Sequence, residues 1–132
     1  MDLNEVKLLE IQPSQFYLSY EKMARILNWF DPADVSNFEP VPVKMLNGRL
    51  IFTDGHTRAF VAYRAGLTKI TLQWDCDELD DAAYQLCVSA CRRRGVCSIA
   101  DLAGRELPEG EYAAKWNGWC DVLHELLALQ RE

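Results

Sequence analysis

Alternation of hydrophobic and polar residues predicts strands in the first half of the chain. Four segments show this pattern: residues 5–11, 41–46, 49–53 and 69–74. The second and third are separated by Asn47-Gly48. Asn-Gly between two such segments is typical of a two-residue turn, because both of its residues tolerate positive φ. We therefore expect a β-hairpin in the middle of a small sheet.

Hydrophobic residues three and four positions apart predict two helices between these strands. The first helix begins at Ser19 or Tyr20 and ends at Asp31, which is followed by proline. The second covers residues 59–66, with Gly66 suited to the left-handed position that ends a helix. The order strand, helix, hairpin, helix, strand predicts a small mixed α/β domain over residues 1–75.

The pattern becomes helical after residue 75. We expect three helices, over residues 78–94, 98–104 and 108–130. Asp77 is the expected cap of the first and Gly95 its end, while Ser98 and Asp101 have the spacing of a capping box. The predicted fold class is thus α+β: a small mixed sheet with a β-hairpin and packed helices, followed by a helical extension over residues 76–132 that packs on it.

Composition limits the function classes. The chain has 132 residues, a net charge of -6 and a pI near 4.9, and 49% of its residues are hydrophobic. It is long enough for a single folded domain, and its acidity argues against a nucleic-acid-binding module, which needs a basic face. The charge is uneven: residues 1–66 carry 7 basic and 8 acidic side chains, whereas residues 67–132 carry 7 and 12. A single nucleotide in a pocket remains compatible with this charge.

The N-terminal residues show no basic and hydrophobic leader, and no hydrophobic run approaches the length of a membrane span. We therefore expect a cytoplasmic protein without membrane partners. The odd number of cysteines favours free thiols over a disulfide framework. Cys87 and Cys91 lie four residues apart on a predicted helix, but the spacing to the other cysteines matches no zinc pattern.

The richest cluster of reactive side chains follows the hairpin, at Asp54-Gly55-His56-Thr57-Arg58. Glycine allows a tight turn, and the helix that follows offers free N–H groups, which form an anion site. Arg58 adds a bidentate phosphate donor, Thr57 a hydroxyl and His56 an imidazole. Asp54 has the chemistry to hold magnesium or to accept a proton. These residues predict either a phosphate site or a simple turn with a capping Asp54, a turn Gly55 and three solvated polar side chains.

The same residues resemble a known family. Asp-Gly-His-Thr-Arg-Ala, followed by a hydrophobic helix and Gly-Leu, resembles the fold shared by the N-terminal domain of ParB partitioning proteins, sulfiredoxin and free-serine kinases, over roughly residues 5–75. The upstream segment 39–43 (Glu-Pro-Val-Pro-Val) is similar to the proline-containing strand of ParB. The resemblance implies a nucleotide ligand (ATP, ADP or CTP) with Mg²⁺ held by Asp54. It implies phosphate contacts from these residues: Ser14, Gln15, Gly55, His56, Thr57 and Arg58.

Departures from each subfamily bear on the chemistry. His56 stands where sulfiredoxin has its cysteine, and the ParB turn Gly-Glu-Arg-Arg is absent. The free-serine kinases are nearest in motif, with Asp-Gly-His-His-Arg, but Gln15 stands where they have a glutamate base. An amide cannot take a proton from an alcohol as a carboxylate does. The candidate catalytic residues are therefore Asp54 and His56, with Glu39 or Glu21 as a substitute base.

Two functions remain open on this sequence. The first is an ATP- or ADP-dependent enzyme that hydrolyses the nucleotide or transfers phosphate to a small hydroxylated molecule. The second is a ParB-like interaction or nucleotide-sensing module without catalysis, whose acidic helical half contacts a protein partner or a second copy of the chain. Partitioning of DNA is disfavoured, because the helical half is the acidic one.

Overall fold

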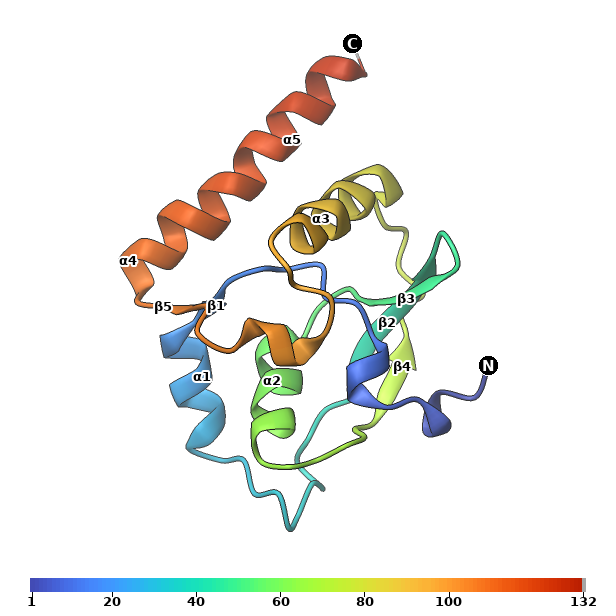
Figure 1. Ribbon diagram of the computed structural model, residues 1–132, viewed down its shortest axis with the longest axis vertical. Helices are drawn as coiled ribbons and strands as arrows, with labels where there is room; N and C mark the ends of the chain where they lie inside the picture. The colour runs from blue at the N-terminus through green and yellow to red at the C-terminus, as the bar shows by residue number, and fades with distance from the viewer. Residues whose placement is uncertain (132) are drawn as a thin grey trace.

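The computed structural model describes residues 1–131. A three-stranded mixed sheet has the strand order β3-β2-β4, with bounds β2 Val41–Leu46, β3 Arg49–Phe52 and β4 Leu72–Trp74 (Figure 1). β2 is antiparallel to β3 and parallel to β4. Asn47 and Gly48 have φ of 51° and 76°, as a type I′ turn requires. The expected hairpin is confirmed, and the expected strand over 69–74 is shortened to three residues.

The expected first strand over residues 5–11 is wrong. This segment forms two 3₁₀ turns, η1 Leu3–Glu5 and η2 Leu8–Glu10, and only Gln12 makes a bridge to the sheet, beside Ile51. The physical reason is the spacing of the buried side chains. Leu8 and Ile11, 1% and 0% exposed, are three positions apart, which matches the period of a 3₁₀ turn and not that of a strand.

Two helices of the first half lie side by side, α1 Tyr20–Leu27 and α2 His56–Arg64 (Figure 1). α1 begins where expected, because Ser19 Oγ accepts a hydrogen bond from the backbone N–H of Lys22 at 3.3 Å. It ends four residues before Asp31. α2 begins three residues earlier than expected, so the reactive turn runs directly into its first turn. Gly66 follows α2 with φ of 93°, as predicted.

The second half is helical, as expected. Its elements are α3 Asp81–Arg93, η3 Ile99–Leu102, β5 Glu106–Leu107, α4 Glu109–Tyr112, the π-helical segment η4 Ala113–Asn117 and α5 Gly118–Gln130. The cap of α3 is Asp80 and not Asp77, because Asp80 accepts from the N–H of Ala83. The capping box of Ser98 and Asp101 is confirmed, on a 3₁₀ turn.

The hydrophobic pattern did not predict a second pair of strands. β5 pairs in parallel with β1 Leu18–Ser19, and this pair ties the start of α1 to the start of α4. From α4 onward the chain is one long helix that runs past α3 toward the C-terminus (Figure 1). Within residues 1–131, no helix combines the length and hydrophobicity needed to cross a membrane.

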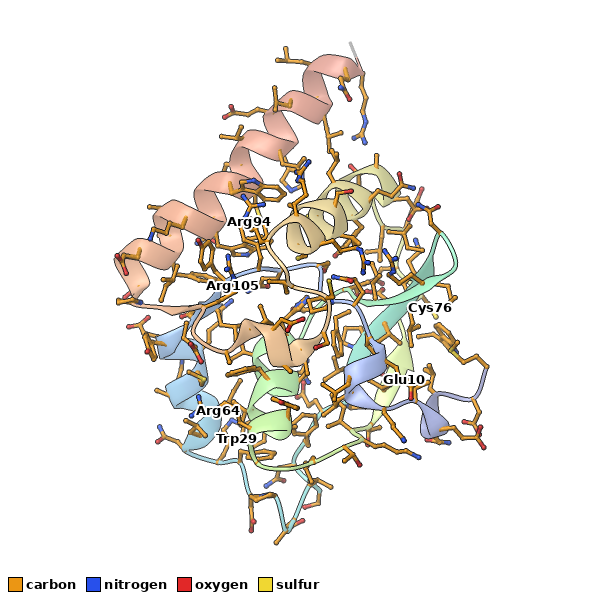
Figure 2. All side chains as sticks on the ribbon, in the orientation of Figure 1. Glu10, Trp29, Arg64, Cys76, Arg94 and Arg105 are labelled. Atoms are coloured by element: carbon orange, nitrogen blue, oxygen red, sulfur yellow. The ribbon has the colours of Figure 1, made fainter. Side chains whose placement is uncertain are left out.

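One hydrophobic core joins the two halves. Phe16, Phe52 and Phe60 are fully buried in the same cluster as Ile99 and Leu102. Two arginines pack against aromatic rings below the C-terminal helix (Figure 2). Arg94 Cζ lies 4.1 Å from the Phe16 ring centroid, and Arg105 Cζ lies 4.6 Å from the Tyr17 ring centroid. The helical extension is therefore packed on the first half through shared core residues.

Candidate functional site

The reactive turn lies at the junction between β3 and α2. Gly55 precedes the helix with φ of 72°, and Asp54 Oδ1 accepts a hydrogen bond from its N–H at 2.8 Å. A Cβ atom at Gly55 would lie 2.9 Å from Arg58 Nη2 and 3.0 Å from Val41 Cγ1. Glycine is required here both by the backbone conformation and by these close neighbours.

A cavity of about 370 Å³ opens at this junction. Its lining residues are Gln15, Lys22, Arg25, Ile26, Asp54, Gly55, His56, Thr57 and Arg58. All five residues of the predicted turn therefore meet at one cavity, together with Gln15. Cations from two helices face one carboxylate, and the N-terminus of α2 adds its partial positive charge. This balance favours an anionic ligand.

Lys22 and Arg25 were not among the residues predicted from the sequence. They lie three positions apart on α1, so they share one face of that helix. Their spacing was visible in the sequence. Their place beside the turn was not, because it depends on the packing of α1 against α2.

His56 is buried, with 4% of its surface exposed, and its Nε2 accepts a hydrogen bond from the Ser14 N–H at 3.0 Å. Burial lowers its pKa from 6.5 to about 4, although the charge of Asp54 opposes this shift. The ring is therefore neutral at pH 7, and its proton is on Nδ1. His56 can donate a hydrogen bond to a ligand, but it brings no positive charge.

Ser14 and Gln15 lie beside His56 and differ in what they offer a ligand. Ser14 lines a second cavity instead of the first, and its hydroxyl donates to the Phe52 carbonyl at 2.7 Å. Gln15 lines both cavities, and its Nε2 donates to the Tyr17 carbonyl at 2.7 Å and the Tyr112 hydroxyl at 3.1 Å. The amide of Gln15 is thereby oriented, and Oε1 is left as an acceptor.

Arg58 and Glu39 interact through the backbone of the latter. Arg58 Nη1 donates to the Glu39 carbonyl at 2.9 Å and to the Pro40 carbonyl at 3.4 Å. The Glu39 side chain is exposed and does not line the cavity, nor does that of Glu21. Among the described residues that line the cavity, the carboxylate belongs to Asp54. A role of Glu39 or Glu21 as a base stays a prediction.

Asp54 is the predicted magnesium ligand. Within the described residues 1–131, no group of three or more His, Cys, Asp or Glu side chains is arranged to hold a metal ion. Mg²⁺ that arrives with a nucleotide needs fewer protein ligands, because phosphates and water complete its octahedron. Oδ1 of Asp54 accepts a hydrogen bond from the Gly55 N–H, which leaves Oδ2 to hold such an ion or to accept a proton.

Three carboxylates that follow β4 are partnered within the protein, those of Asp75, Asp80 and Asp81. Asp75 accepts from the Thr53 hydroxyl at 2.7 Å. Both carboxylate oxygens of Asp80 accept from Arg131 at 2.9 Å, and Asp81 forms an ion pair with Lys44. The Asp81–Lys44 pair joins α3 to β2, whereas the Asp80–Arg131 pair lies within the helical half.

All five cysteines are free, as expected. Comparison with family models, curated proteins and solved structures gives no significant match. The resemblance to the ParB and sulfiredoxin fold therefore stays a prediction that depends on the turn motif and the order of elements.

Proposed function

We propose that this protein binds a nucleotide through its phosphates in the cavity between α1 and the N-terminus of α2. The observation that carries the proposal is the convergence of Lys22, Arg25 and Arg58 on that cavity. Charge-assisted hydrogen bonds from such cations are the stronger kind. The first residues of α2 line the same cavity, and the free N–H groups of a first helical turn favour phosphate binding.

The remaining lining residues fit a nucleotide with magnesium. Thr57 supplies a hydroxyl and His56 a neutral N–H donor, and the Mg²⁺ that accompanies a nucleotide would be held by its phosphates and water. Transfer of a phosphoryl group depends chiefly on positioning and charge neutralisation. We therefore propose transfer of the terminal phosphate to a small hydroxylated molecule, with Asp54 as the group that takes up the proton.

Gln15 favours a second candidate function. Gln15 carries a neutral amide instead of a carboxylate, yet it lines the cavity where the resemblance implies a kinase base. A site with the same cations and without turnover would sense a nucleotide. The two functions share the ligand and differ only in whether product is formed.

Calorimetry tests the binding step. Wild type is titrated with ATP, ADP and CTP in the presence of Mg²⁺, and Lys22→Gln and Arg25→Gln are compared with Arg49→Gln, an exposed arginine of β3 outside the cavity. Each cavity variant is expected to weaken binding by about tenfold or more, because a hydrogen bond to a charged group is lost. Arg49→Gln is expected to bind like wild type.

Two results would oppose the proposal: no nucleotide binds below about millimolar concentration, or the cavity variants bind as the control does. Turnover is measured separately with radiolabelled ATP. Asp54→Asn is expected to abolish product formation. The absence of product with wild type, in protein that binds ATP, would favour the sensing function.

A further inference from the structure

A second cavity of about 190 Å³ lies between the end of β3, α3 and the C-terminal helix. Its lining residues are Ser14, Gln15, Thr53, His56, Asp80, Ala83, Tyr84, Cys87, Trp116, Cys120, Leu123 and His124. Most of its walls come from the helical half, beyond the segment that carries the family resemblance. We call this space the inner chamber.

The inner chamber is weakly charged. Burial raises the pKa of Cys87 to about 12 and that of Cys120 to about 11, so both thiols are protonated at neutral pH. The Asp80 carboxylate is paired with Arg131. With Ala83 and Leu123, these walls suit a hydrophobic group better than an ion.

We call the first cavity, between α1 and the start of α2, the phosphate cavity. The inner chamber meets it at Gln15 and His56, which line both cavities. The Nε2 atoms of both side chains already form hydrogen bonds. Gln15 Nε2 donates to the Tyr17 carbonyl and the Tyr112 hydroxyl, and His56 Nε2 accepts from the Ser14 N–H. An acceptor, Gln15 Oε1, and a donor, His56 Nδ1–H, remain at this boundary. A hydroxyl group both donates and accepts, so it matches this pair.

The wall of the chamber also contains an unusual backbone element. Trp116 belongs to the π-helical segment Ala113–Asn117, which interrupts an otherwise α-helical run. Such segments occur frequently at functional sites. Tyr112, which accepts the hydrogen bond from Gln15, directly precedes this segment. The segment therefore shapes both the chamber wall and the support of Gln15.

We propose that the inner chamber binds a small uncharged alcohol with an alkyl or aryl body, whose hydroxyl lies between Gln15 and His56. Its role as the phosphoryl acceptor rests on the proposed function. The hydroxyl oxygen forms a bond to the terminal phosphorus while the bond from that phosphorus to the bridging oxygen breaks. The nucleotide leaves one phosphate shorter, and the hydroxyl proton passes to Asp54.

Binding of benzyl alcohol to the full chain tests the chamber. Ligand-observed NMR without nucleotide compares wild type with Cys120→Phe, which fills the chamber, and with Cys97→Phe, which places the same side chain at an exposed position outside it. Cys120→Phe is expected to bind at least tenfold more weakly, and Cys97→Phe as wild type. L-serine and glycerol are expected to bind more weakly than benzyl alcohol.

The inference is overturned if wild type does not bind benzyl alcohol, or if Cys120→Phe binds it as well as wild type. Circular dichroism checks the fold, and Cys120→Leu replaces Cys120→Phe if the latter unfolds. Preference for serine or glycerol would also overturn it.

A second measurement separates the inference from the function on which it rests. With Mg²⁺ and ATP, ³¹P NMR is expected to show benzyl phosphate from wild type and at least tenfold less from Cys120→Phe, at equal ATP affinity. ATP binding without alcohol binding overturns the inference alone. Alcohol binding without ATP binding overturns the proposed function, and with it the acceptor role.

Discussion

At the scale of single residues, His56 shows how position changes chemistry. A histidine in a polar turn suggests a titratable, ligand-facing side chain. Here the imidazole instead receives the Ser14 N–H and contacts the Phe52 ring at a centroid distance of 5.6 Å. The buried neutral ring joins the segment before α1 to the start of α2, so it supports the site and leaves Nδ1–H for a ligand.

The pH dependence of stability should report this burial. The pKa of His56 is about 4 in the folded protein and 6.5 in the unfolded chain. Between these values the unfolded state binds more protons, so stability falls as pH falls from 6.5 to 4. His56 is expected to lower the free energy of unfolding by about 3 kcal/mol between pH 6.5 and pH 4. Above pH 6.5 it has no such effect, because the ring is then neutral in both states.

Urea denaturation at pH 7.5, 6, 5 and 4 measures this loss. His56→Gln is expected to remove about 3 kcal/mol of the acid-induced decrease, whatever its stability at pH 7.5. His124→Gln is the matched control, because His124 is the second histidine of the chain and is exposed on α5. Equal decreases in wild type and His56→Gln would contradict the assignment.

At the scale of elements, the sequence predicted those features that depend on a few neighbouring residues. The hairpin follows from Asn47-Gly48, and the start of α1 from Ser19. The pair β1-β5 has two residues in each strand, too few for an alternating pattern. In the same way the residues of the Asp54–Arg58 turn could be grouped from the sequence because they are consecutive, whereas the contributions of α1 to their cavity depend on tertiary packing.

The turns before and after β3 offer a direct test of the site's geometry. Gly48 and Gly55 both have positive φ, but a Cβ meets no atom within 4 Å at Gly48, whereas at Gly55 it meets Arg58 and Val41. Both Gly→Ala variants lose about 1–2 kcal/mol from the left-handed backbone. Gly55→Ala must in addition displace the Arg58 guanidinium, so we expect a larger loss of stability there.

Nucleotide affinity distinguishes the two variants further. Gly55→Ala is expected to weaken ATP binding by about tenfold or more, because Arg58 moves from its place over the turn. Gly48→Ala is expected to bind ATP like wild type. Urea denaturation and calorimetry on the same samples provide both comparisons. Equal effects of the two substitutions on stability and affinity would contradict the close packing at Gly55.

At the scale of the whole molecule, the charged side chains of the two halves lie in different surroundings. The cations of the phosphate cavity come from the first half. Carboxylates of the acidic half are engaged in pairs that fasten α3, such as Asp81 with Lys44 of β2 and Asp80 with Arg131 beyond α5. The sequence showed the uneven charge of the two halves, but charge alone contains no information on the core that they share.

That core predicts that residues 1–75 do not fold alone. Ile99 and Leu102 of η3 are 0% exposed in the cluster that contains Phe16 and Phe60. Removal of one such leucine side chain alone costs about 2–5 kcal/mol, which is comparable with the total stability of a small domain. A fragment that ends at residue 75 lacks η3 and α3 together.

A fragment of residues 1–107 is the informative comparison. It keeps η3 and the β1-β5 pair, and it loses the C-terminal helix with the Trp116 and Trp119 rings that pack 4.9 and 5.0 Å from the Phe16 ring. We expect cooperative urea unfolding and dispersed amide resonances for residues 1–107, at lower stability than the full chain, and neither for residues 1–75. Cooperative unfolding of residues 1–75 would show instead that the sheet and its two helices form an independent domain. In that case the shared core would be an interface between domains, and the phosphate cavity would survive without the inner chamber.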